Sequence, residues 1–126
     1  MTAARALLVR EQDIVRACLA VLRLRGVFAY RQNQGAFHPQ GKNQRFVRFT
    51  SINGISDIIG VMPNGRFIAV ECKRSGNVPT ADQQTFLDAV NRRGGLGIVI
   101  TDAADLAEIL DRELGDADRR DQRGAA

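Results

Sequence analysis

The chain has 126 residues, 44% hydrophobic and 25% charged, as expected for one globular domain with a single core. Its formal net charge of +4 favours polyanionic partners, and all but two of its 18 basic residues are arginine, which binds phosphate through paired hydrogen bonds. No apolar run is long enough to span a membrane, and one histidine with two cysteines is too few for a structural zinc site.

The first predicted element is a helix from about Ala4 to Arg25, which Gly26 ends. Its apolar stripe consists of Leu7, Ile14, Val15, Cys18 and Leu22. Glu11 lies in the middle of this stripe, where a buried carboxylate needs a cation or another partner. Two interpretations remain open. Glu11 belongs to a functional site, or it lies near a frayed helix start, where the helix dipole favours it.

Val27 to Gln32 predicts a strand with Phe28 and Tyr30 on one face. The polar segment from Asn33 to Asn53 follows, and Phe46 to Thr50 within it is a candidate short strand. Basic residues alternate with aromatic ones there, a pattern that suits either a phosphate backbone or a solvated loop with a hydrophobic anchor. The candidate DNA-binding residues are Lys42, Arg45, Arg48 and, further along the chain, Arg74.

Two short apolar runs, Asp57 to Met62 and Arg66 to Lys73, flank Pro63-Asn64-Gly65 and predict a β-hairpin. Proline suits the first position of a three-residue turn whose glycine is left-handed, and that turn places Asp57 opposite Glu71. A two-residue Asn-Gly turn would instead place Asp57 opposite Cys72. We expect the three-residue turn, with Lys73 on the same face as Glu71.

The charges at the open end of this hairpin form a candidate metal site. Opposed carboxylates repel unless a cation lies between them, and Mg²⁺ is typically held by one or two carboxylates together with a substrate phosphate. A lysine beside such an ion can orient or deprotonate an attacking water, or stabilise developing charge. A solvent-exposed cluster of Asp57, Glu71 and Lys73 with little energetic effect explains the same hairpin equally well.

Thr80 is predicted to begin a helix that runs to about Arg93, because Thr80-Ala81-Asp82-Gln83 fits a capping box. Gln83 also shares a face with apolar residues of this helix, so its amide has two compatible interpretations: a helix cap, or a group that points into the site and positions water or Lys73.

The remaining elements are a buried strand, Leu96 to Thr101, and a helix from Ala103 to about Leu114 with Asp102 as its cap. A strand, helix, strand order favours a parallel edge to the sheet. Residues 115–126 alternate in charge and have no large apolar side chain, which predicts a disordered tail. The element order predicts an α/β fold, with residues 1–114 as its single domain.

Asp57, thirteen intervening residues and then Glu71-Cys72-Lys73 resemble the PD-(D/E)xK nuclease signature, with Ser56 in place of its usual proline. More narrowly, the chain resembles the VRR-NUC (virus-type replication–repair nuclease) family over about residues 9 to 110. The motifs that carry this resemblance are, in order, Glu11, Gly54-Ile55-Ser56-Asp57, Glu71-Cys72-Lys73 and Thr80-Ala81-Asp82-Gln83.

The resemblance implies a restriction-endonuclease-like core, a small mixed sheet flanked by helices. It implies Mg²⁺ or Mn²⁺ held by Asp57, Glu71 and the Cys72 backbone carbonyl, with Glu11 completing the site through a second metal or a coordinated water, and with Lys73 and Gln83 as further catalytic groups. It also implies a metal-dependent DNA endonuclease, a homodimeric Holliday-junction resolvase acting in DNA repair, in the cytoplasm of a bacterial or phage-infected cell.

Two alternatives remain. One is a flap or nicking nuclease of the same fold. The other is a catalytically silent DNA-binding module, against which the presence of every polar site residue argues.

Overall fold

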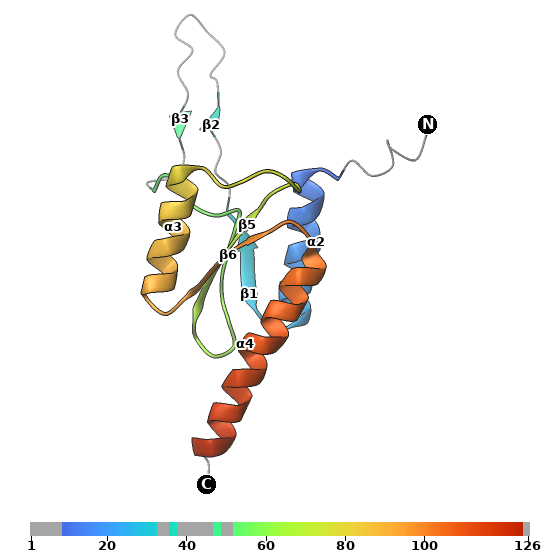
Figure 1. Cartoon of the computed structure of the whole chain (residues 1–126), viewed down its shortest axis with the longest axis vertical. Helices are drawn as coiled ribbons and strands as arrows, with labels where there is room; N and C mark the ends of the chain where they lie inside the picture. Colours follow the sequence, from blue (N-terminus) through green and yellow to red (C-terminus); the bar gives the residue numbers. More distant parts are fainter. Residues whose placement is uncertain (1–8, 33–35, 38–46, 49–51, 125–126) are drawn as a thin grey trace, which may run out of the picture.

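The computed structural model describes residues 9–32, 36–37, 47–48 and 52–124. Their elements, in chain order, are α2 (Glu11–Leu24), β1 (Phe28–Arg31), β2 (Ala36–Phe37), β3 (Val47–Arg48), β4 (Ile58–Val61), β5 (Phe67–Cys72), α3 (Ala81–Arg92), β6 (Leu96–Ile100) and α4 (Ala103–Gly124) (Figure 1). None of the helices in the described part of the chain has the length and apolar character that a bilayer crossing requires.

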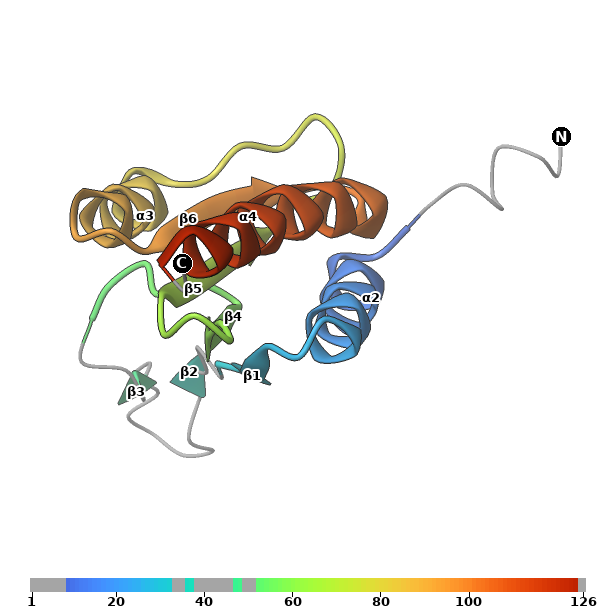
Figure 2. The same cartoon turned by 90° about the horizontal axis from the view of Figure 1, so that it is seen from below.

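Four strands form one mixed sheet in the order β1-β4-β5-β6, antiparallel except for the parallel pair β5 and β6. Helices α2 and α4 lie on one face of this sheet and α3 on the other (Figures 1 and 2). The predicted α/β fold with a small mixed sheet between helices, and the parallel edge, are therefore confirmed. A separate two-stranded sheet pairs β2 with β3, so the candidate strand from Phe46 to Thr50 is present over Val47 and Arg48.

Most of the core lies on the face that α2 and α4 cover. There the predicted α2 stripe is buried at Ile14, Val15, Cys18 and Leu22, and both cysteines are free, buried thiols. On the other face, α3 packs Leu87 against Ile59 and Ala69. One helix covers only part of that face, so several large side chains remain exposed on it or at its rim, among them Phe28, Tyr30, Val61, Phe67 and Val99.

The start of α2 differs from the prediction. Val9 and Arg10 are not helical, and Arg10 caps the helix with an extended backbone, so α2 begins at Glu11 rather than near Ala4. Glu11 and Asp13 then occupy the first turn, where the helix dipole favours negative charge. Residues 1–8, including Leu7 of the predicted stripe, lie outside the described residues.

The other end of α2 follows the prediction. Gly26 has a φ of +74°, which glycine adopts readily. Its N–H donates to Arg23 O at 3.1 Å, and the Val27 N–H donates to Leu22 O at 3.0 Å, the two hydrogen bonds of a Schellman motif. This cap turns the chain directly into β1.

The C-terminal end of α4 also differs from the prediction. The sequence predicts a helix to about Leu114 and a disordered tail from residue 115, but α4 continues to Gly124. The tail prediction is therefore wrong for residues 115–124. The segment lacks proline, and its alanine, arginine and glutamine residues have good helix propensity, so continuing the existing helix avoids a new nucleation step.

Candidate metal centre

The β4–β5 turn has the predicted three-residue form. The Met62 N–H donates to Arg66 O at 2.8 Å, the Gly65 N–H donates to Met62 O at 2.8 Å, and Gly65 has a φ of +86°. The ladder pairs Ile58 with Val70 and Val61 with Phe67, so the predicted register is confirmed. Continued by one residue, this register places Asp57 opposite Glu71, on the sheet face that α3 covers.

Asp57 is held by the backbone of β5. The Cys72 N–H donates to Asp57 Oδ2 at 2.8 Å, which fixes the carboxylate beside the end of the strand. The N–H and C=O of one strand residue point to the same side, so the Cys72 carbonyl also points toward the chain that carries Asp57. This backbone geometry is compatible with the predicted role of the Cys72 carbonyl as a ligand.

Glu71 is the most unusual group of the sheet. It is 1% exposed, and its Oε2 atom has no hydrogen-bond partner among the residues that the structure describes. Burial and then the negative charge of Asp57 raise the pKa of Glu71 to about 8, and Lys73 opposes this rise. A divalent cation between Asp57 and Glu71 would displace the proton and supply the missing partner, so this pair of carboxylates fits a hard metal ion.

Lys73 lies where the hairpin predicts. Its Nζ atom is 3.6 Å from Glu71 Oε1, and its side chain is largely buried. The backbone N–H of Lys73 donates to Ile100 O at 3.0 Å, which continues the hydrogen bonding of β5 to β6 beyond the end of the strand. The structure therefore brings Asp57, Glu71 and Lys73 together at one end of the sheet.

Glu11 is less closely joined to this cluster. It is the first residue of α2 and is partly exposed, which agrees with the interpretation that places it at a helix start. Across the described ranges, no three His, Cys, Asp or Glu side chains gather closely enough to hold a metal ion together. Glu11 therefore does not complete a three-carboxylate centre with Asp57 and Glu71 in this structure.

Gln83 forms the predicted capping box at the start of α3. Its Oε1 atom accepts from the Thr80 N–H at 2.8 Å, and the Gln83 N–H donates to Thr80 Oγ1 at 3.2 Å. The amide oxygen is thus occupied by the cap, while its nitrogen remains as a donor.

Sequence reasoning gave Gly54 and Ser56 no role. Gly54 has a φ of +77°, and a Cβ atom there would lie 2.2 Å from the Asp82 carbonyl carbon, so only glycine allows α3 to begin against the segment that leads to Asp57. The only feature of the sequence that indicated a role for Gly54 was its place in the motif Gly54-Ile55-Ser56-Asp57. Ser56 is fully buried, and its hydroxyl has no hydrogen-bond partner within the described part of the chain.

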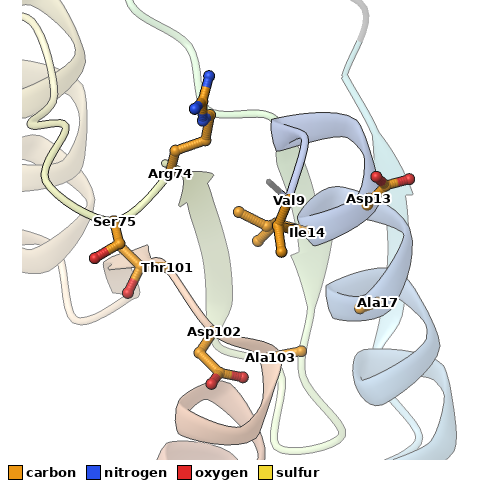
Figure 3. Close-up of a pocket in the computed structure, with 9 residues that line it drawn as sticks. All are labelled: Val9, Asp13, Ile14, Ala17, Arg74, Ser75, Thr101, Asp102 and Ala103. Atoms are coloured by element: carbon orange, nitrogen blue, oxygen red, sulfur yellow. The ribbon is translucent and has the colours of Figure 1, made fainter. Parts of the chain in front are cut away.

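The candidate DNA-binding residues are only partly described. Lys42 and Arg45 lie outside the described residues, and Arg48 belongs to β3, where it pairs with Ala36 of β2. Arg74 is exposed and lines a cavity of about 390 Å³ with Ser75, Thr101 and Asp102 (Figure 3).

The start of α2 forms the opposite wall of this cavity, through Val9, which precedes the helix, and through Asp13 and Ile14 of its first turn (Figure 3). Arg74 directly follows Lys73 in the chain, so the start of α2 lies at the same end of the sheet as the candidate metal centre. Glu11 is therefore on the correct side of the molecule, although not within a shared ligand cluster.

Comparisons with known proteins agree with this architecture. No protein-family model and no curated protein matches this sequence. A solved structure described as a "VRR_NUC domain" superposes with a TM-score of 0.53, covers 83% of this chain and 94% of its own, and shares 15% sequence identity. The chain therefore has the fold of a VRR_NUC domain, as the order of its motifs predicts.

Proposed function

We propose that this protein is a metal-dependent endonuclease of the VRR-NUC type that hydrolyses phosphodiester bonds in DNA. The observation that carries the proposal is the fully buried carboxylate of Glu71, which lies beside Asp57 and 3.6 Å from Lys73 Nζ, and whose Oε2 atom has no hydrogen-bond partner among the described residues. An unpaired carboxylate in a sheet interior is costly, and a cation ligand offsets this cost. The VRR_NUC fold supports the same reaction class.

Asp57, Glu71 and the Cys72 carbonyl would hold Mg²⁺ or Mn²⁺. When bound, such an ion polarises the scissile phosphate and lowers the pKa of its water. Lys73 presents its ammonium group beside Glu71, where it orients the attacking water or stabilises the charge that develops on the phosphate. The amide nitrogen of Gln83 would position the attacking water or Lys73, and Glu11 would complete the site from the start of α2, through a second metal or a coordinated water.

The leading substrate is a four-way DNA junction, cut by a homodimer in the cytoplasm of a bacterial or phage-infected cell. The family resemblance supports this choice, and so does symmetry, because two symmetric nicks need two sites related by a two-fold axis. The Arg74 cavity at the site end of the sheet and the net charge of +4 support a polyanionic substrate.

The test is cleavage of end-labelled junction, flap, duplex and single-stranded DNA in the presence of Mg²⁺, Mn²⁺ or EDTA. We expect junction cleavage with a divalent metal and none with EDTA. Preferential cleavage of flaps or duplex DNA would show that the protein is a flap or nicking nuclease rather than a resolvase. DNA binding without cleavage under either metal would overturn the proposal in favour of a silent DNA-binding module.

A further inference from the structure

Within the described part of the chain, no strand pairs with the outer edge of β1. Strand β1 is the last strand in the order β1-β4-β5-β6, and β4 is its only strand neighbour among the described residues. Soluble proteins normally protect such an edge with proline, a bulge or inward-pointing charges. The sequence Phe28-Ala29-Tyr30-Arg31 has no proline, and its one charge is at the end.

The opposite edge shows the protection that β1 lacks. On β6, the Gly97 N–H donates to Asn91 Oδ1 at 2.8 Å, and Asn91 Nδ2 donates to Gly97 O at 3.0 Å. The Asn91 amide thus occupies the outward-facing backbone donor and acceptor of Gly97, the second residue of β6. A second chain has no free pair of backbone groups to join at that point.

Backbone N–H and C=O groups alternate in direction along β1, and one hydrogen bond to β4 shows which residues direct theirs outward. The Gln32 N–H donates to Asp57 O at 2.7 Å, so Gln32 and, by alternation, Tyr30 and Phe28 direct their backbone groups toward β4. Ala29 and Arg31 therefore direct theirs toward the open edge. The side chains beside that edge are large and apolar, with Phe28 78% and Tyr30 50% exposed.

We propose that a second copy of this chain adds to this edge, with the two β1 strands antiparallel about a two-fold axis that passes beside Ala29. Directly opposed residues share a sheet face, so this register pairs Ala29 with Ala29 of the second copy and Phe28 with Tyr30 of the second copy. The Ala29 pair exchanges two backbone hydrogen bonds. The two aromatic pairs cover side chains that are exposed in one chain alone.

This arrangement has a consequence for catalysis that rests on the proposed nuclease function. A two-fold axis perpendicular to the continuous sheet keeps both Asp57–Glu71 clusters on the same face. From the spacing of strands and residues, the two clusters lie roughly 30 Å apart. That is close to one turn of B-form DNA, about 34–36 Å, so one bound substrate reaches both sites.

The first test measures mass in solution by sedimentation or light scattering, without DNA. We expect the wild type at twice the 13.8 kDa of one chain. Phe28→Lys should give monomers, because it places a charge in each aromatic pair. Ala29→Pro should do the same, because it removes an N–H that faces outward while the hydrogen bonds to β4 remain. The matched control is Val78→Lys, also 78% exposed but in the β5–α3 loop, which should remain dimeric.

The second test determines the register in which the two β1 strands pair. After mild oxidation, the double variant Phe28→Cys with Tyr30→Cys should give a covalent dimer on a non-reducing gel, because the paired Cα atoms of a non-hydrogen-bonded pair lie about 4.5 Å apart. Each single variant should remain largely uncrosslinked, since neither residue then opposes itself.

A monomeric wild type at high micromolar concentration would overturn the proposal, as would a dimer that survives both Phe28→Lys and Ala29→Pro. Strong cross-linking of Phe28→Cys alone would overturn the register. A monomer whose β1 edge binds an added extended peptide would assign the edge to a foreign strand instead. Cleavage of labelled DNA by the same preparations is scored separately, so loss of the dimer and loss of the nuclease function remain distinguishable.

Discussion

Glu71 is the residue at which burial and charge conflict most strongly in this protein. Its carboxylate is 1% exposed, lies close to that of Asp57, and has Lys73 as its nearby cation. These surroundings stabilise the protonated form in the absence of a metal ion. The conflict makes this position the point where stability, metal binding and catalysis are coupled.

The pH dependence of stability tests this coupling. The pKa of Glu71 rises from an ordinary 4.5 to about 8 in the folded state, so the folded state holds a proton that the unfolded state has lost. The protonated Glu71 side chain therefore stabilises the folded state. This stabilisation is fully present below pH 4.5 and is lost as the pH rises to about 8, at roughly 1.4 kcal/mol per pH unit. The measurement is denaturant unfolding of the wild type and of Glu71→Gln in EDTA. The difference between their free energies of unfolding should change with pH by this slope. A constant difference between the two proteins from pH 5 to 8 would contradict it.

Catalytic variants test the roles of the cluster. Asp57→Asn, Glu71→Gln and Lys73→Met should each lower the cleavage rate by ~10²–10³-fold, the usual effect of losing one electrostatic group in the transition state. DNA affinity in EDTA should hold for Lys73→Met and for Glu71→Gln, whose carboxyl group is already protonated without a metal ion, and should tighten for Asp57→Asn, which loses a negative charge that faces phosphate. The matched control is Glu108→Gln, an exposed carboxylate on α4. Cleavage by Asp57→Asn at the wild-type rate would rule out the assigned chemistry.

At the scale of elements, the site depends on how the start of α3 meets the segment before β4. The capping box fixes the first turn of α3, and Gly54 lets that turn approach the chain that leads to Asp57. The atoms that a Cβ at position 54 would meet are backbone atoms of Asp82 and Gln83, so no change of side-chain rotamer could relieve that overlap.

Gly54→Ala should therefore be strongly destabilising, by more than the ~1–3 kcal/mol that an unfavourable backbone conformation alone costs, because its Cβ also overlaps the Asp82 backbone. The matched control is Gly115→Ala in α4, where a Cβ meets no atom within 4 Å. This second change should stabilise the protein by about 0.5–1 kcal/mol through helix propensity. Chemical denaturation of both variants measures the difference, and equal effects would contradict the assigned packing.

Gln83→Glu separates the cap from the proposed catalytic role. Glutamate also completes a capping box, so the free energy of unfolding should hold, whereas Gln83→Ala should lose about 1 kcal/mol. Glutamate lacks the amide donor, so we expect cleavage to fall by roughly tenfold, the equivalent of one hydrogen bond. Wild-type cleavage by Gln83→Glu would limit Gln83 to its structural role.

At the scale of the whole molecule, positive charge and the site meet at one end of the sheet. Arg74 lines the cavity between α2, the β5–α3 loop and the start of α4, next in the chain to Lys73 (Figure 3). Arg74→Ala should weaken DNA binding and reduce the slope of log affinity against log salt by about 1. Arg112→Ala on α4 should leave the slope unchanged. Identical slopes for wild type and Arg74→Ala would exclude a phosphate contact there.

The features that the sequence determined by itself are those made by neighbouring residues. Pro63-Asn64-Gly65 set the hairpin register, Gly26 ended α2, and Thr80 with Gln83 capped α3, because each depends on hydrogen bonds within a few residues. The hairpin register in turn placed Asp57, Glu71 and Lys73 together. The order of these motifs was enough to predict the VRR_NUC fold.

Tertiary structure decided the properties that depend on distant parts of the chain. The complete burial of Glu71 requires β6 on one side of β5 and α3 on its face, and the edge contact of Asn91 with Gly97 joins α3 to β6. The start of α2 and the length of α4 also escaped local rules, because helix ends are set by packing and caps as much as by propensity. Whether a carboxylate is exposed or buried is a property of its surroundings, and only the assembled sheet and helices supply them.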